Sequence, residues 1–263
     1  MKRRHGKARE VSDIRQDQAQ LLTVNDNFYI REAYKSLRTN VMFSITSEGD
    51  SRVIMMTSAM PGEGKSTTAA NLAISLAEAG KKTLLIDCDL RKPRQARLLN
   101  LHSNKGLSDA LVQESKEKVP LLQVKDLELY VLTAGSIPPN PSELLGSGRM
   151  KNLLDRMRQE FAYIILDTPP INVVTDAVAL SHYTDGTLLV VRSGITEHNA
   201  VSHAVDQLKR ASAKLLGFVL NDVEQKNPSS YGHKKYGYGY GYGYGYGYGY
   251  GEKQDRDDSH EKR

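Results

Sequence analysis

The chain is poor in the features that mark secreted or membrane-spanning proteins. It has one cysteine, Cys88, so no intramolecular disulfide can form, which fits a reducing cytosol. Its longest apolar runs, such as residues 164–166 and 188–191, are far too short to cross a bilayer. No apolar segment follows the basic first ten residues, which argues against a signal peptide. We therefore expect a cytoplasmic protein.

Metal-ligand spacing and a strong excess of one charge are also lacking. The seven histidines show no zinc-type spacing with cysteines or carboxylates, and the net charge is a mild +5. The N-terminal basic cluster could attract anionic lipid or nucleic acid. We interpret it as a solvated end instead and expect no nucleic-acid partner.

Three regions differ in composition: a polar arm over residues 1–27, a domain over 28–225, and a low-complexity tail over 226–263. Within the domain, apolar runs alternate with helical patterns, which predicts an α/β fold with a mostly parallel sheet covered by helices on both faces. Strands are expected at 52–57, 82–86, 129–133, 163–166, 187–191 and 215–220, and helices at 65–79, 142–159 and 196–211. Right-handed crossovers would bring the carboxyl ends of the strands to one edge, where ligands bind.

The loop after the first strand has the Gly-Lys-Ser ending of a Walker A phosphate-binding loop, in the required strand–loop–helix setting. Backbone N–H groups and a helix N-terminus would face a polyanion there, Lys65 would neutralise the β- and γ-phosphates, and Ser66 would ligate Mg²⁺. Ala59 stands where the usual first glycine is expected, and a chance turn that opens a helix is the alternative. The predicted nucleotide-binding residues of this loop are Pro61, Gly62, Glu63, Gly64, Lys65, Ser66 and Thr67.

Two further loops carry aspartates directly after predicted strands. Asp87 and Asp89 follow one strand, and Asp167 ends another before Pro169 and Pro170 stop it. Neighbouring carboxylates beside a phosphate site repel each other unless a cation intervenes, and Mg²⁺ bound to a nucleotide supplies that cation. Each aspartate alone is better explained by a helix cap or a turn, but three such signals in the right context favour a nucleotide site.

The segments Pro-Gly-Glu-Gly-Lys-Ser-Thr, Asp-Cys-Asp-Leu-Arg and Asp-Thr-Pro-Pro closely resemble the Walker A, A′ and B motifs of the bacterial tyrosine kinases (BY-kinases). The likeness extends to residues 135–145 and 217–221 and covers roughly residues 30 to 222. It implies a P-loop NTPase-like domain that uses ATP and Mg²⁺ to phosphorylate protein tyrosines. The chain is similar to the Gram-positive form, a kinase module without the fused transmembrane activator, which belongs to capsule or exopolysaccharide systems.

The resemblance also implies a role for each site residue. Lys65 would hold the phosphates, Ser66 the metal, and Asp89 and Asp167 would act on Mg²⁺ directly or through water. Asp87 would position the tyrosine hydroxyl and help to deprotonate it, because a phenol of pKa about 10 is protonated at neutral pH.

Two further polar residues are candidates for the nucleotide site. Arg91 would sense a phosphate or brace its loop. Asn221 follows the last strand and would contact the adenine ring or simply end the strand, two interpretations that stay equally open. We interpret Cys88 as a core residue, since an acidic neighbourhood raises the pKa of a thiol.

Residues 32–38 resemble the oligomerisation helix of the family, with Glu32, Lys35 and Arg38 on one broad helical face. Lys35 replaces an arginine, which weakens bidentate pairing with a carboxylate. The resemblance implies a homo-oligomer in the form of a ring, whereas the spacing alone favours an ordinary charged helix. Further implied partners are a transmembrane adaptor of the polysaccharide co-polymerase type, which would recruit the kinase to the inner face of the membrane, and a phosphotyrosine phosphatase.

Nine of the 14 tyrosines lie in the tail, most of them in eight consecutive Tyr-Gly units. Glycine disfavours helix and packed strand, so the hydroxyls are expected to be presented one after another as phosphate acceptors. A self-associating aromatic tail is the alternative. The predicted acceptors are Tyr231, Tyr236, Tyr238, Tyr240, Tyr242, Tyr244, Tyr246, Tyr248 and Tyr250.

Two other functions fit the same motifs. An assembly ATPase of the MinD or ParA type shares the fold, but its signature lysine would stand five residues before Lys65, where this chain has Met60. A non-catalytic scaffold could bind nucleotide only to set its shape. The full acidic set and the tyrosine tail favour the kinase.

Overall fold

The structure is a computed structural model that describes residues 21–22, 27–45, 49, 51–112 and 118–223. The predicted N-terminal arm, apart from a few residues, and the nine predicted acceptor tyrosines lie outside the described residues. Within the described part, no helix is both long and apolar enough to span a membrane.

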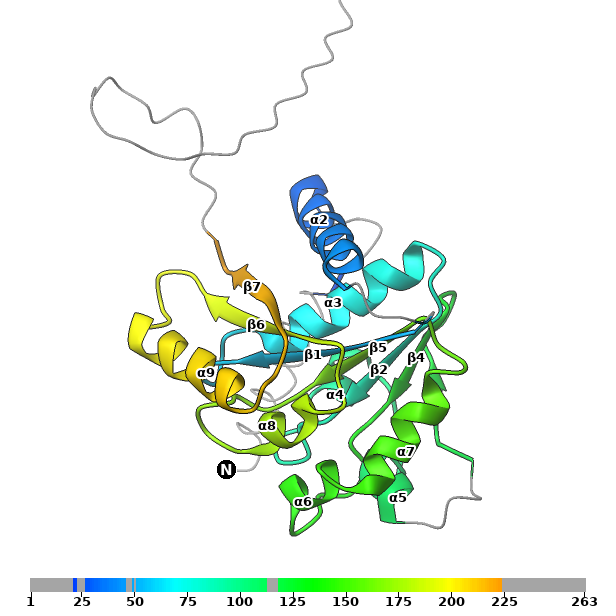
Figure 1. Cartoon of the computed structure of the whole chain (residues 1–263). Coiled ribbons are helices and arrows are strands. Elements are labelled where there is room, and N and C mark those ends of the chain that lie inside the picture. Colours follow the sequence, from blue (N-terminus) through cyan, green and yellow to red (C-terminus); the bar gives the residue numbers. More distant parts are fainter. Residues whose placement is uncertain (1–20, 23–26, 46–48, 50, 113–117, 224–263) are drawn as a thin grey trace, which may run out of the picture. The chain divides into compact units, whose positions relative to one another are not determined.

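A seven-stranded sheet forms the centre of the domain, in the order β3-β4-β2-β5-β1-β6-β7. All neighbouring pairs are parallel except β3 with β4, which are antiparallel (Figure 1). This confirms the predicted α/β class and the mostly parallel sheet. The strands are β1 (Arg52–Ser58), β2 (Thr83–Asp87), β3 (Leu122–Gln123), β4 (Leu129–Leu132), β5 (Tyr163–Asp167), β6 (Gly186–Arg192) and β7 (Leu215–Asn221).

Helices cover both faces of the sheet, as predicted. On one face, α3 (Lys65–Glu78) lies against the central strands and α2 (Phe28–Ser44) packs outside it (Figure 1). On the other face lie α7 (Gly148–Met157), α8 (Asp176–Ser181) and α9 (His198–Arg210). Short helices complete the fold: α4 (Gln95–Leu98), α5 (Leu107–Val112) and α6 (Pro141–Leu145).

The central strands are buried on both faces, which explains their continuous apolar sequences. In β1, Val53 and Met55 face one apolar cluster, while Ile54 and Met56 face the other. Complete burial of side chains of this size stabilises the fold by about 1.5–3 kcal/mol each. The sheet is therefore a rigid support for the loops at its carboxyl edge.

The single helix predicted over residues 142–159 is wrong, because the chain forms α6 and α7 with a break at Gly146 and Ser147. The Ser147 side chain accepts a hydrogen bond from the backbone N–H of Met150 and so begins a new helix. The short elements α4, α5, α8 and β3 were not predicted, since two to six residues show no clear periodicity.

Candidate active site

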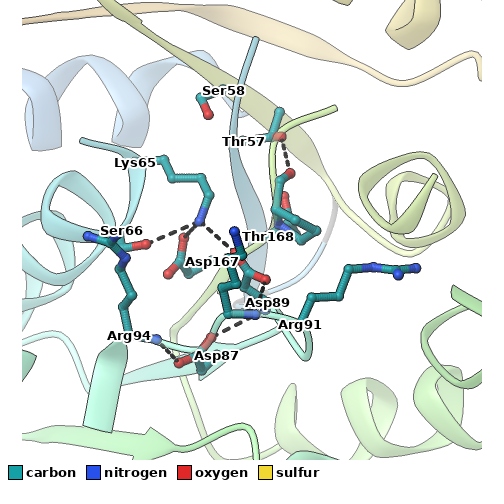
Figure 2. A network of polar contacts seen from close by, with 12 residues as sticks. Thr57, Ser58, Lys65, Ser66, Asp87, Asp89, Arg91, Arg94, Asp167 and Thr168 are labelled. Atoms are coloured by element: carbon teal, nitrogen blue, oxygen red, sulfur yellow. Dashed lines mark hydrogen bonds and ion pairs between the residues drawn. The ribbon is translucent and has the colours of Figure 1, made fainter. Parts of the chain in front are cut away.

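The carboxyl ends of β1, β2 and β5 bring the three predicted loops together around one ammonium group (Figure 2). Lys65 Nζ lies 3.2 Å from Asp89 Oδ2 and 3.3 Å from Asp167 Oδ1, and it donates to Ser66 Oγ at 3.1 Å. Asp87 and Asp167 are direct neighbours in the parallel register of β2 and β5. Residues up to 102 positions apart in the chain thus form one charged cluster.

The phosphate-binding loop depends on two glycines with left-handed backbone conformations. Gly62 has φ of 83° and Gly64 has φ of 85°, which other residues rarely adopt. A Cβ on Gly64 would also lie 2.1 Å from Asn221 Nδ2, so the Asn221 side chain would have to move to admit it. The Asn221 amide donates to the carbonyl oxygen of Glu63 at 3.0 Å and ties the end of β7 to this loop.

Glu63 is buried in the same loop and fixes its shape from within. Its Oε1 accepts from the Thr196 hydroxyl at 2.5 Å, and its Oε2 accepts from the Met60 backbone N–H at 3.0 Å. The loop before α9 therefore braces the phosphate-binding loop. Thr196 was not predicted as part of the site, because the contact joins loops that are 133 residues apart.

Asp87 is fully buried and organises the backbone of the loop after β2. Its carboxylate accepts backbone N–H groups from Asp89 at 3.2 Å, Arg94 at 3.0 Å and Gln95 at 2.9 Å. Burial, and then the nearby Asp167 carboxylate, raise the pKa of Asp87 to about 7 despite these hydrogen bonds. A group with this pKa can exchange a proton near neutral pH.

Lys65 and Cys88 respond differently to the same surroundings. Burial lowers the pKa of Lys65, but the carboxylates of Asp167, Asp89 and Asp87 outweigh it, so the net shift is upward. Burial and the same carboxylates hold the pKa of the Cys88 thiol well above its usual value. The interpretation of Cys88 as an unreactive core residue is confirmed by its complete burial.

Gln95 is a site residue that the sequence analysis missed. It is fully buried, and its Nε2 donates to Asp167 Oδ2 at 2.7 Å and to the Ser66 carbonyl oxygen at 3.0 Å. Its Oε1 has no hydrogen-bond partner among the described residues. Gln95 begins α4, so a helix of four residues carries the amide that links the Walker A and Walker B segments.

Arg91 braces the loop after β2 against the helices of the other face. Its Nε and Nη2 contact the two carboxylate oxygens of Asp176, each at 3.0 Å, and Nη2 also donates to Ser142 Oγ at 3.2 Å. The Asp176 side chain is fully buried, and its contact raises the pKa of Arg91. Bracing is thus the observed role of Arg91, and contact with a phosphate stays a prediction.

A pocket of about 190 Å³ opens beside the phosphate-binding loop. Lys65 and Asp89 reach its wall, whereas Asp87 is fully buried. The rest of the wall divides into the phosphate-binding loop, a cationic side and an apolar side. The lining residues are Pro61, Gly62, Lys65, Ser66, Thr67, Asp89, Arg91, Lys92, Arg94, Pro169, Pro170, Val173 and Val174.

These groups fit a Mg²⁺–nucleotide complex. Three carboxylates surround one ammonium, so the cluster has an excess of negative charge that a divalent cation would offset. Among the described residues, no group of three or more His, Cys, Asp or Glu side chains forms a metal site of its own. Mg²⁺ is bound through one or two carboxylates together with substrate phosphates, which suits Ser66, Asp89 and Asp167.

The three predicted oligomerisation residues have partners within the chain. Lys35 Nζ pairs with Glu32 Oε1 at 2.6 Å, one turn away on α2. Arg38 Nη1 donates to the carbonyl oxygen of Ser75 on α3 at 2.7 Å. Exposed apolar side chains flank them, among them Phe28 and Phe43. Assembly through this helix stays a prediction.

Comparisons with known proteins show the family to which the chain belongs. Residues 51–215 match the protein family described as AAA domain. The chain is 43% identical over 202 residues to the tyrosine-protein kinase YwqD of Bacillus subtilis (strain 168), covering 77% of this chain and 85% of that protein. It is 37% identical to the putative tyrosine-protein kinase CapB of Staphylococcus aureus, covering 77% and 88%.

Solved structures of tyrosine kinases are also similar to this chain. The chimerical protein CapA2B2 superimposes with a TM-score of 0.68 at 41% identity, covering 73% of this chain and 84% of that one. The kinase domain of the Escherichia coli tyrosine kinase ETK gives 0.67 at 31% identity, covering 77% and 80%. MinD of Pyrococcus horikoshii OT3 gives 0.54 at 23% identity, a likeness of fold alone. The chain belongs to the bacterial tyrosine-protein kinases.

Proposed function

We propose that this kinase transfers the γ-phosphate of ATP to tyrosines in the C-terminal segment of another copy of the chain, between Tyr231 and Tyr250. The observation that carries the proposal is the Lys65 cluster beside an open pocket, in a chain that supplies nine tyrosines after its last strand. The pocket offers room for a phenol next to the phosphate-binding loop.

In the proposed reaction, the tyrosine hydroxyl oxygen forms a bond to the γ-phosphorus while the bond from that phosphorus to the β–γ bridging oxygen breaks. ADP leaves, and the phenolic proton passes to a carboxylate. Mg²⁺, held by Ser66, Asp89 and Asp167 directly or through water, would neutralise phosphate charge. Lys65 faces the transferred group from the N-terminus of α3.

Asp87 is the proposed proton acceptor, and its pKa near neutrality supports that role. Its complete burial means that the acceptor reaches it only after the loop after β2 shifts, whereas Asp89 already faces the pocket. Comparing the Asp87→Asn and Asp89→Asn variants shows which of the two carboxylates accepts the proton. If Asp87 accepts the proton, Asp87→Asn lowers kcat and leaves Mg²⁺ binding intact, whereas Asp89→Asn weakens Mg²⁺ binding.

Modification would also change how copies associate. Each phosphate adds about −1.5 to −2 charges, so nine sites would add on the order of −14 to −18. A fully modified tail has no tyrosine left for the pocket, so this polyanion would leave the acidic site. Its departure would loosen an assembly that holds unmodified tails, such as the ring-shaped homo-oligomer that the resemblance to the family implies. We place this switch in capsule or exopolysaccharide production, with a transmembrane adaptor at the inner face of the membrane and a phosphotyrosine phosphatase that resets the tail.

Mixing two variants tests the proposal. One variant has all nine tail tyrosines changed to Phe and keeps the kinase site, and the other carries Lys65→Met and keeps the tail. Each alone should incorporate no phosphate into its tail, because one lacks acceptors and the other lacks Lys65. The mixture with Mg²⁺-ATP should phosphorylate the Lys65→Met chain. Phosphate that never reaches that chain, while a wild-type chain modifies itself, would exclude transfer between copies.

A further inference from the structure

The pocket has two unlike walls beyond the phosphate-binding loop. The chain after β5 supplies Pro169, Pro170, Val173 and Val174, and Val173 is 56% exposed. The chain after β2 supplies cationic side chains on the other side. An aromatic ring is suited to the first wall, and an anion is suited to the second.

The cationic side chains of this second wall differ in whether they already have a partner within the chain. Arg91 is engaged with Asp176. Lys92 and Arg94 are exposed, and among the described residues their side chains have neither a hydrogen-bond partner nor an ion-pair partner. In Figure 2 the Arg94 side chain extends from the loop toward the beginning of α3, whereas Arg91 points away from Lys65. Two positive charges thus stand at the pocket without a counter-charge of their own.

The backbone that carries these two charges is held in place by the site itself. Asp89 Oδ1 accepts the Lys92 backbone N–H at 3.0 Å, and Asp87 Oδ2 accepts that of Arg94 at 3.0 Å. Pro93 between them restricts φ. The attachment points of both cations are therefore fixed relative to the carboxylates at which the reaction is proposed to take place.

The repeat in the tail provides the matching ligand. In an extended peptide, residues two positions apart point to the same side and lie about 7 Å apart. The Tyr-Gly units place a tyrosine at every second position from Tyr236 to Tyr250, with glycines that leave the space between rings free. A peptide with one ring at the apolar wall thus brings its next ring close to the same pocket.

We propose that Lys92 and Arg94 bind the phosphate of an already modified tyrosine, two positions from the acceptor tyrosine that occupies the pocket. The inference rests on the proposed function and gives it a substrate preference. The first phosphate transfer to a Tyr-Gly repeat is then the slowest. A tail that already carries a phosphotyrosine is a better substrate than an unmodified tail. Chains in one sample become either unmodified or heavily modified.

The test uses the full chain, Mg²⁺-ATP and synthetic Tyr-Gly repeat peptides that contain one acceptor tyrosine. The residue two positions before or after the acceptor is either phosphotyrosine or phenylalanine. Two charge-assisted contacts at an exposed site predict a kcat/KM roughly tenfold higher for a phosphotyrosine peptide than for its phenylalanine counterpart. Raising the salt concentration should reduce that ratio, because exposed charges are screened.

The full chain with Lys92→Gln and Arg94→Gln should bring the ratio close to one. The matched control, Lys209→Gln, removes an exposed cation at the far end of α9 and should keep the full ratio. Intact mass spectra after partial reaction give a second readout. The wild-type tail should show unmodified and heavily modified chains together, and the double variant should show a single broad distribution.

The outcomes separate the inference from the function on which it rests. Equal kcat/KM for the phosphotyrosine and phenylalanine peptides in the wild-type chain would overturn the inference and leave the kinase proposal standing. A ratio that persists in the double variant would overturn the assignment to Lys92 and Arg94. A wild-type chain that modifies neither peptides nor its own tail would contradict the proposed function.

Discussion

The two loops that flank the pocket begin alike and continue in opposite ways. Each starts with a fully buried aspartate at a strand end, Asp87 on β2 and Asp167 on β5, and the two are partners in register. The loop after β2 then becomes exposed and cationic, and the loop after β5 becomes apolar with two prolines. In the proposed function, the shared beginning would serve the metal and the nucleotide, and the unlike continuations would shape the space left for an acceptor.

The largest effect is expected at Lys65, whose ammonium joins both loops through Asp89 and Asp167. Lys65→Met should lower the rate of tail phosphorylation by roughly 10³ or more, since it removes the charge that faces the transferred phosphate. A phosphate-release and transfer assay measures this, with Lys209→Met as the control. Transfer within tenfold of wild type would show that the two loops act without the ammonium between them.

Asp87, at the beginning of the loop after β2, can be tested through the pH dependence of stability in metal-free protein. The folded pKa of Asp87 is raised from 3.8 to about 7, so the folded state holds a proton that the unfolded state has lost. The contribution of Asp87 to the free energy of unfolding therefore falls as pH rises between these values, by up to about 4 kcal/mol. Asp87→Asn should flatten the slope of stability against pH in this window.

Chemical denaturation at a series of pH values in EDTA gives that slope. The Asn variant also loses backbone hydrogen bonds, but that loss does not depend on pH, so it shifts the curve without changing its slope. The same slope in both proteins would mean that Asp87 is already ionised in the folded chain.

A smaller effect is expected at Gln95, whose amide reaches from the loop after β2 to Asp167 at the head of the other loop. Gln95→Leu should lower stability by about 1–3 kcal/mol, because it leaves the buried Asp167 Oδ2 and the Ser66 carbonyl without their donor. Thermal melts of the metal-free and Mg²⁺-ADP forms measure it. An unchanged melting temperature in both forms would show that the hydrogen bonds of the Gln95 amide do not contribute to stability.

The smallest effect is expected at the apolar wall. Val173→Glu places a charge where an acceptor ring would lie and should raise the KM for a tyrosine peptide about fivefold to tenfold, with little change in the KM for ATP. Val112→Glu is the matched control, because Val112 is a similarly exposed valine, at the end of α5, whose backbone carbonyl oxygen accepts a hydrogen bond from Arg149 of α7. An equal rise in the KM for ATP would place nucleotide, and not the acceptor, at this wall.

The sequence was sufficient to predict the parallel sheet and the meeting of three loops, because fully buried strands have continuous apolar runs and their carboxyl ends meet at one edge. It was insufficient for Gln95, Asp176 and Thr196, whose partners lie far away in the chain. Short helices such as α4 and α8 leave no periodic signal, although they carry Gln95 and Asp176. The break at Gly146 and Ser147 was hidden by apolar positions that suit one helix as well as two.

The most direct test of the account is mass spectrometry of the intact chain after incubation with Mg²⁺-ATP and a membrane fraction from its own source, beside a Lys65→Met chain treated in the same way. The account predicts stepwise addition of phosphate to the wild-type chain, confined to peptides from residues 231–250, and no addition in the Lys65→Met chain. Consumption of ATP without any change in mass would contradict it and would favour an assembly ATPase.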